Sequence, residues 1–276
     1  MTMPYPTRSD GPLVSIVTPV LNAAATLQQC LDSVRQQSYT PIEHIVIDGG
    51  SSNGTIDILR RHAERLAYWV SEPDCSTATA FNKGLAAAKG SVLAFLNADD
   101  WYERDAVSRA VAALEASGAD FTYGAVEVHG LEGSLGILRP LPPALWQQES
   151  LYQMPVPHIS MFFHRESLGR IGPFDERCTS TSDHDQFIRL LAAGCRAVEL
   201  EGVVGHIRTG GDADSLKAFW ESWAIAGRHG APSGRRLRRF GRYLAVYAIR
   251  KLAKALLGRR RTAQLLARLG SRHVSA

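Results

Sequence analysis

The chain has 276 residues, of which 45% are hydrophobic and 21% charged, as in ordinary globular proteins. This composition excludes disordered and collagen-like proteins, and the length predicts one large α/β domain or one domain with an appendage. The four cysteines lack a C-x-x-C spacing, so we expect neither a zinc knuckle nor a disulfide framework. No apolar signal-peptide core and no run of about 18 apolar residues occurs, so we predict neither a secretory signal nor a transmembrane helix.

Charge divides the chain into two unequal parts. Residues 1–234 carry 18 Lys and Arg against 27 Asp and Glu, a net charge of −9, whereas residues 235–276 carry 13 basic and no acidic residues. A basic segment on an acidic body is typical of a tail for an anionic partner, either a membrane surface or nucleic acid.

In the N-terminal part, short β-branched runs alternate with helical patterns, which predicts βα units and a largely parallel sheet. Ligands of open α/β sheets bind beyond the carboxyl ends of the strands, so we expect residues 19–22, Asp48 and residues 99–100 to line one cleft. The expected strands are 13–18, 42–48, 68–71 and 91–96, and the expected helices follow Asn22, follow the turn at 49–54, and span 78–88.

Beyond residue 105 the alternation weakens, which predicts a second half of different organisation. The expected helices are 105–117, 183–193 and 215–227, and the expected strands are 121–128, 135–139, 197–200 and 203–207.

Asp99 and Asp100 follow an apolar strand and are candidate metal ligands. Carboxylate oxygens suit Mg²⁺ and Mn²⁺, which neutralise charge on a departing diphosphate. The alternative is that one of them caps a helix that begins near Glu103.

The turn after Asp48 could bind an anion through its backbone, but it lacks the Walker and G-x-G-x-x-G patterns, which counts against an ATPase and a dehydrogenase.

The stretch TSDHD at 181–185 opens a predicted helix. A carboxylate at such a position acts as a general base if it faces the cleft, and the alternative is an N-cap formed by Ser182 or Asp183. His158 and His206 lie in apolar surroundings, where a lone histidine is more often a structural residue than a ligand.

In their order along the chain, these segments resemble the family 2 glycosyltransferases, which have the GT-A fold. VSIVTPVLNAAATLQQCLDSVRQQSYTPIEHIVIDGGSSNGT is similar to the nucleotide-binding half, and SEPDCSTATAFNKGLAAAKGSVLAFLNADDW continues it to the metal motif. HISMFFHRESLGRIGPFDE, TSDHDQFIRLLAAG and HIRTGGDADS are similar to the acceptor half. The resemblance covers residues 12–215.

The resemblance implies a nucleotide-sugar site in the first half of the domain. Pro19 and Asn22 would line the nucleotide base, and Asp48 would hydrogen-bond the base or the ribose. Asn82 and Lys83 match a turn of the family that packs beneath the nucleotide sugar.

The resemblance also implies a metal and a base. Asp99 matches the metal-binding aspartate of the D-x-D motif, with Asp100 beside it at the nucleotide sugar, and the ion would be Mn²⁺ or Mg²⁺. Asp183 matches the catalytic base, and His206 falls near a further ligand of the metal or the diphosphate. The chain departs from the family where Asn97 replaces the first aspartate of the motif, where Ser182 replaces a glutamate, and at 76–79.

The function implied is inverting transfer of a sugar from a nucleoside diphosphate, expected to be UDP, to a hydroxyl of a glycan or lipid-linked acceptor in cell-surface polysaccharide synthesis. One alternative is a nucleotidyltransferase, against which the lack of Lys and Arg at 17–26 counts. The other is a catalytically silent module that binds a nucleotide sugar and docks on membranes. The expected organisation is a flexible N-terminus at 1–12, a GT-A domain at 13–230 with halves 13–105 and 106–230, and a tail at 231–276.

The tail is expected to form a basic amphipathic helix. Residues 235–258 place Leu237, Phe240 and Leu244 on one helical face and arginines on another, which is typical of a helix at a membrane interface. We therefore expect an anionic membrane partner and a cytoplasmic protein at the inner face of the cell membrane. Packing on the catalytic domain is the main alternative, and without a recognition motif we predict no nucleic-acid binding.

Overall fold

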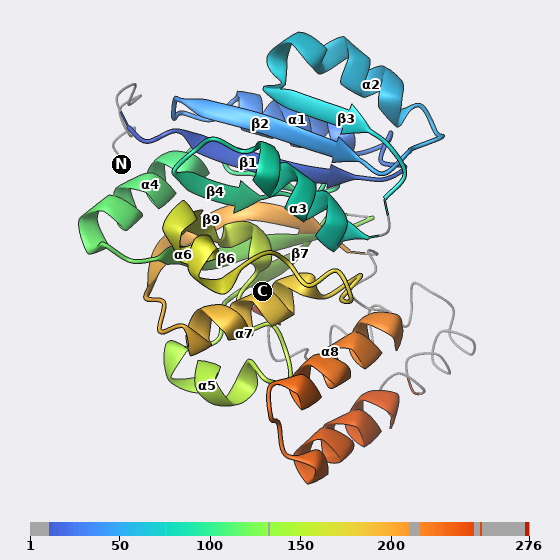
Figure 1. Ribbon diagram of the computed structural model, residues 1–276, viewed down its shortest axis with the longest axis vertical. Coiled ribbons are helices and arrows are strands. Elements are labelled where there is room, and N and C mark those ends of the chain that lie inside the picture. Colours follow the sequence, from blue (N-terminus) through green and yellow to red (C-terminus); the bar gives the residue numbers. More distant parts are fainter. Residues whose placement is uncertain are drawn as a thin grey trace.

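The computed structural model describes residues 11–74, 76–131, 133–209, 216–245, 249 and 274–275, and shows helices around one mixed sheet (Figure 1). Its first half comprises β1 (Val14–Val20), α1 (Leu27–Arg35), β2 (Ile42–Asp48), α2 (Thr55–His62), η1 (Ala63–Arg65), β3 (Tyr68–Ser71), α3 (Thr77–Ala87), β4 (Val92–Phe95) and β5 (Trp101–Tyr102). Its second half comprises α4 (Ala106–Ser117), β6 (Phe121–Gly130), β7 (Gly133–Leu138), η2 (Pro143–Leu145), α5 (Trp146–Glu149), η3 (His158–Ser160), β8 (Phe162–His164), α6 (Arg165–Ile171), α7 (Ser182–Ala192), β9 (Ala197–Arg208), α8 (Leu216–Arg228) and β10 (Val274–Ser275).

The strand order is β10-β7-β6-β8-β4-β1-β2-β3, with β9 beside β6 and β5 beside β9. β3, β2, β1 and β4 are parallel, and β8 is antiparallel to both β4 and β6. The carboxyl ends of β1, β2 and β4 therefore meet at one edge of the sheet, as expected from the βα alternation.

The central strands are buried on both faces, which explains their nearly continuous apolar sequences. On β4, Leu93 and Phe95 belong to the core beneath α3 and α7, whereas Val92 and Ala94 belong to the core beneath α4. Alternate side chains of one strand thus support helices on opposite faces of the sheet.

Several elements differ from the sequence prediction, among them β9, β5 and β8. The segments 197–200 and 203–207 form the single strand β9, because its parallel pairing with β6 continues across a shift of register. The short strands β5 and β8 were not expected, since two or three residues carry no measurable periodicity.

The described part of the tail packs on the domain. Residues 233–245 are helical and lie beside α8 (Figure 1). Phe240 stacks on Phe219 at 5.4 Å between ring centroids, and the Arg236 guanidinium lies 3.9 Å from the Trp223 ring centroid. No helix in the described ranges is both long and apolar enough to span a bilayer. Most of 246–276 lies outside the described residues.

Candidate active site

The loops after β1 and β2 form one hydrogen-bonded unit at the carboxyl edge of the sheet. The Asn22 backbone N–H donates to Oγ of Ser51 over 2.7 Å, and Oδ1 of Asn22 accepts from the Ser52 N–H over 2.9 Å. Asn22 has a φ of 53°, in the left-handed region that asparagine tolerates. Pro19 lies in β1 itself, directly before the first of these loops and not in it. The structure thus brings together segments 29 or more residues apart.

Asp48 is fully buried at the end of β2, where its carboxylate holds the following turn. Oδ2 accepts from the N–H groups of Gly50 (3.2 Å) and Ser51 (3.0 Å) and from Oγ of Ser71 (2.6 Å). Oδ1 accepts from the Ser51 hydroxyl. Asp48 therefore shapes the turn, and its hydrogen bond to a base or ribose stays a prediction.

Asp99 and Asp100 lie in the turn between β4 and β5. Oδ2 of Asp100 accepts from the Asn97 amide (3.3 Å), and Oδ1 accepts from the Arg208 N–H (3.2 Å). Burial and the adjacent Asp99 carboxylate raise the pKa of Asp100 to about 8, and burial also raises the pKa of Asp99. A divalent cation would compensate both carboxylates, so the residues fit Mg²⁺ or Mn²⁺, with Asp99 the more exposed ligand.

The capping alternative for this pair is wrong. Helix α4 begins at Ala106, and its N-cap residue is Asp105. Neither Asp99 nor Asp100 therefore caps the N-terminus of α4.

Asp183 lies half-buried in the first turn of α7. The N-cap residue is Thr181, so the alternative of a cap at Ser182 or Asp183 is also wrong. Oδ1 of Asp183 accepts from the His184 N–H over 2.9 Å. One oxygen of Asp183 thus binds a backbone N–H of the first turn, and the role of this carboxylate in proton transfer stays a prediction.

His158 lies between α7 and β4, the strand that precedes the turn with Asp99 and Asp100. Burial lowers the pKa of His158, and the nearby Asp183 carboxylate opposes this effect. The imidazole stacks on Phe95 of β4, with ring centroids 5.7 Å apart and planes 12° apart. Phe95 precedes Asn97 by two residues. His158 thus lies near Asp183 and against the strand that precedes Asp99, and a shared site of the two carboxylates stays a prediction.

Asn82 and Lys83 lie within helix α3, which confirms the helix expected at 78–88 and corrects the turn that the resemblance implied. The Asn82 amide donates to the Phe174 carbonyl (3.0 Å), and its Oδ1 accepts from the Phe174 N–H (2.8 Å). Nζ of Lys83 lies 2.7 Å from the Glu72 carboxylate. A Cβ on Gly84 would lie 2.2 Å from Cγ1 of Val17, so α3 sits directly against β1.

Glu221 of α8 holds the segment before α7, a role that the sequence analysis missed. Its carboxylate accepts hydrogen bonds from the backbone N–H groups of Thr179, Ser180 and Thr181 and from two hydroxyls. Although burial opposes its charge, these donors hold the pKa of Glu221 below its usual range. Glu221 thereby sets where α7 begins and where Asp183 lies.

His206 does not contact the Asp99 carboxylate in the described structure. It lies in β9, opposite Trp101 of β5, and the two rings stack with centroids 4.8 Å apart. Its polar contacts go to Glu103, Glu127 and His129. The expected pairing of His206 with Asp99 in one metal site therefore stays a prediction without a contact. Residues 210–215 of the motif that follows lie outside the described residues.

The mixed, mostly parallel sheet flanked by helices is the GT-A fold of glycosyltransferases. The sequence profile of Glycosyl transferase family 2 matches residues 15–176, and this chain belongs to that family. The uncharacterized glycosyltransferase Rv1514c of Mycobacterium tuberculosis is 34% identical over 205 residues, which cover 74% of this chain and 78% of the relative.

Two solved structures share the fold. The mannosyltransferase PcManGT from Pyrobaculum calidifontis, solved with GDP-Man and Mn²⁺, has a TM-score of 0.60 and 24% identity, covering 98% of this chain and 84% of its own. Residues 1–349 of S. aureus TarS, solved with UDP-GlcNAc, have a TM-score of 0.60 and 18% identity. That match covers 77% of this chain and 65% of the TarS chain, so about a third of the TarS chain lies outside the matched region.

Proposed function

We propose that this protein is an inverting glycosyltransferase that moves a sugar from a nucleoside diphosphate, preferentially UDP, to a hydroxyl of a glycan or lipid-linked acceptor. The observation that supports the proposal is that Asp183 acts on the charge of His158, whose ring stacks on Phe95 of β4, the strand that leads to Asp99. Asp183 heads α7, and Asp99 follows β4. A base and a cation ligand at one sheet edge are what displacement of a diphosphate requires.

In the proposed reaction, Asp183 removes the proton of the acceptor hydroxyl. The hydroxyl oxygen forms a bond to the anomeric carbon as the bond from that carbon to the diphosphate oxygen breaks, and the configuration inverts. A Mg²⁺ or Mn²⁺ ion held by Asp99 would neutralise charge on the leaving diphosphate. Pro19, Asn22 and the turn held by Asp48 would receive the nucleotide.

A donor screen tests this proposal. The full chain is incubated with UDP- and GDP-sugars, with and without Mn²⁺, and thermal stabilisation and release of free nucleotide are measured. We expect one donor to stabilise the protein in a metal-dependent way and to be slowly hydrolysed. Nucleotide-sugar binding without any turnover on a panel of hydroxyl acceptors would favour the silent module, and pyrophosphate release from a nucleoside triphosphate would favour a nucleotidyltransferase.

We propose further that the tail attaches the enzyme to an anionic membrane at its cytoplasmic face, in cell-surface polysaccharide synthesis. Residues 246–276 carry 8 of the 13 basic residues of the tail. In the adjoining helix, Leu237 is 68% exposed and Trp220 of α8 is 49% exposed. Apolar side chains beside a basic segment support binding to a lipid interface, at about 1 kcal/mol for each basic residue near the surface.

Truncation after residue 245 tests the tail while it keeps the helix that packs on α8. We expect the full chain to sediment with phosphatidylserine vesicles and the truncated chain to stay in the supernatant, with raised salt weakening the binding of the full chain in part. Activity on a soluble acceptor should survive. Equal sedimentation of both chains would show that residues 246–276 do not bind the membrane.

A further inference from the structure

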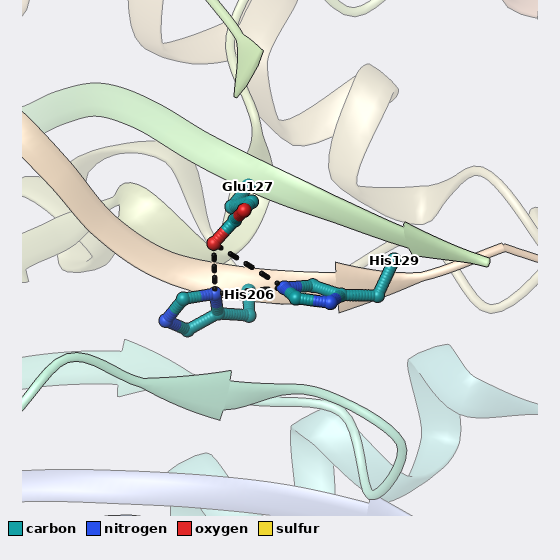
Figure 2. A group of neighbouring side chains, drawn as sticks. All are labelled: Glu127, His129 and His206. Atoms are coloured by element: carbon teal, nitrogen blue, oxygen red, sulfur yellow. Dashed lines mark hydrogen bonds and ion pairs between the residues drawn. The ribbon is translucent and has the colours of Figure 1, made fainter. Parts of the chain in front are cut away.

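Three side chains on neighbouring strands converge on one point beside the proposed active site. Glu127 and His129 come from β6, and His206 comes from β9 (Figure 2). The parallel ladder places Glu127 directly opposite His206, and His129 lies two residues further on the same face of β6. The three ligand atoms lie within 4.8 Å of one another.

The separations match those within a metal coordination shell. Nε2 of His129 is 3.0 Å from Nδ1 of His206, and Oε2 of Glu127 is 3.1 Å from His206 Nδ1 and 3.4 Å from His129 Nε2. Bonds of ~2.0–2.1 Å to a tetrahedral ion separate neighbouring ligand atoms by roughly 3.3 Å. The three atoms thus already occupy positions close to three corners of such a shell.

The surroundings orient His206 for binding. Its Nε2 lies 2.8 Å from the Glu103 carboxylate, which accepts a hydrogen bond from the Nε2–H group. The Nδ1 lone pair is then directed toward Glu127 and His129. Trp101 covers the other side of the ring in a stack with planes 12° apart. Only 12% of the His206 side chain and 21% of the His129 side chain are exposed. Histidines that bind metals have this carboxylate support.

We propose that Glu127, His129 and His206 bind a Zn²⁺ ion at a site separate from Asp99. Two imidazoles and one carboxylate suit Zn²⁺ far better than Mg²⁺, which prefers oxygen ligands. The fourth position is left to water. The ion fastens β6 to β9, and through Glu103 and Trp101 it fastens β5 to both.

The zinc site would also support the turn that carries Asp99 and Asp100. The Arg208 guanidinium lies 4.8 Å from the Trp101 ring centroid, and the Arg208 N–H donates to Asp100. A zinc ion that fixes His206 therefore also fixes the partner of Asp100 two residues along β9. This role is structural and is independent of the ion that the glycosyl transfer requires.

Zinc analysis of the full chain tests the proposal. The protein is stripped with a chelator, dialysed against Zn²⁺ in excess Mg²⁺, and zinc per chain is measured by atomic emission, with affinity from competition against a chromogenic chelator. We expect about one zinc per chain in the wild type and in Asp99→Asn. His129→Gln and His206→Gln should lower the affinity more than about a hundredfold, and Glu103→Gln about tenfold. His62→Gln, on α2, is the matched control.

Circular dichroism of each variant separates loss of zinc from loss of fold, and Glu127→Gln gives a near-isosteric check if a histidine variant unfolds. Unchanged zinc affinity in the triad variants, or no stoichiometric zinc in the wild type, would overturn the proposal. Loss of zinc in Asp99→Asn would show one shared site and overturn the separation. A thiolate-to-metal charge-transfer band after Co²⁺ substitution would place the ion at a cysteine instead. The zinc measurement contains no nucleotide sugar, so its outcome does not depend on whether the protein transfers a sugar.

Discussion

The donor edge and the acceptor edge of the proposed active site are held in different ways. At the donor edge, loops from adjacent strands bond directly to each other, as Asn22 does to Ser51, and a buried Asp48 fixes the turn. At the acceptor edge, the segment that precedes Asp183 is held by Glu221, which lies on α8 some 40 residues further along. The donor edge is therefore part of the sheet, whereas the acceptor edge depends on the docking of a helix outside it.

Asp185 strengthens this dependence. Its buried carboxylate accepts from Nε of Arg189 on the same helix (2.7 Å), and it lies 2.9 Å from Nε2 of His229, just beyond α8. Helix α7 is thus joined to the α8 segment at both its first turn and the preceding loop. A change in α8 should alter acceptor chemistry before it alters donor binding.

The largest expected effect comes from Asp183→Asn. A general base contributes roughly 10²–10⁴-fold in rate, so turnover should fall by about that factor while donor affinity stays within about twofold. Steady-state rates and nucleotide-sugar calorimetry measure the two quantities. Loss of donor affinity would mean that the two edges are not separate.

Asp99→Asn should act on the donor edge. We expect a loss of about a thousandfold in transfer, together with loss of Mn²⁺-dependent nucleotide binding, because the ion supplies several kcal/mol to the departing diphosphate. Asp57→Asn, which removes an exposed carboxylate on α2, is the control and should retain activity. Full activity of the wild type in excess chelator would contradict the role of Asp99.

Glu221→Gln should loosen the acceptor edge. Hydrogen bonds to a charged group contribute about 1.5–3 kcal/mol, so we expect the free energy of unfolding to fall by about 2–3 kcal/mol. Turnover should fall with donor affinity unchanged, and amide exchange should rise at 179–184. Glu64→Gln, an exposed carboxylate near α2, should change none of these. Equal exchange rates in both variants would show that α8 does not hold this loop.

The smallest expected effect is a pH dependence of global stability through His44 of β2. Burial, aided by the charge of His62, lowers the pKa of His44 to about 3, and its Nε2 lies 2.9 Å from Oγ1 of Thr18. In the unfolded chain a histidine has a pKa of about 6.5, so below that pH proton binding to His44 stabilises the unfolded chain. Between pH 7 and 5 the wild type should lose about 2 kcal/mol more stability than His44→Gln in denaturant unfolding. Identical losses would show that His44 is not buried as a neutral ring.

Much of the parallel half of the fold was predictable because its signals are local. The expected strands at 42–48 and 68–71 coincide with β2 and β3, where β-branched residues precede a turn. Elsewhere, β5 and β8 exist through pairing with distant strands, and β9 runs through Gly202, whose φ is 74°. Pairing of that kind leaves no periodic pattern in the segment itself.

The candidate site was predictable to a similar degree. Asp99, Asp100 and Asp183 follow recognisable strand and helix boundaries, so the sequence locates them. Glu221 was missed because a glutamate on an amphipathic helix carries no sign of the loop that it holds. Glu127 and His129 alternate on one strand, a period-2 signal that was available, but only the parallel ladder of β6 and β9 brings His206 to them.

The contact between Gly84 and Val17 has a consequence for redesign of the proposed donor site. Because helix α3 rests on β1 with no room for a methyl group, the distance of α3 from the sheet is set by a backbone-to-side-chain contact rather than by an adjustable side chain. Enlarging Gly84 would lift the whole helix, and with it Asn82 and its bonds to Phe174, instead of filling a gap. We therefore propose to alter donor selectivity at 76–79, where the chain departs from the family, rather than at Gly84.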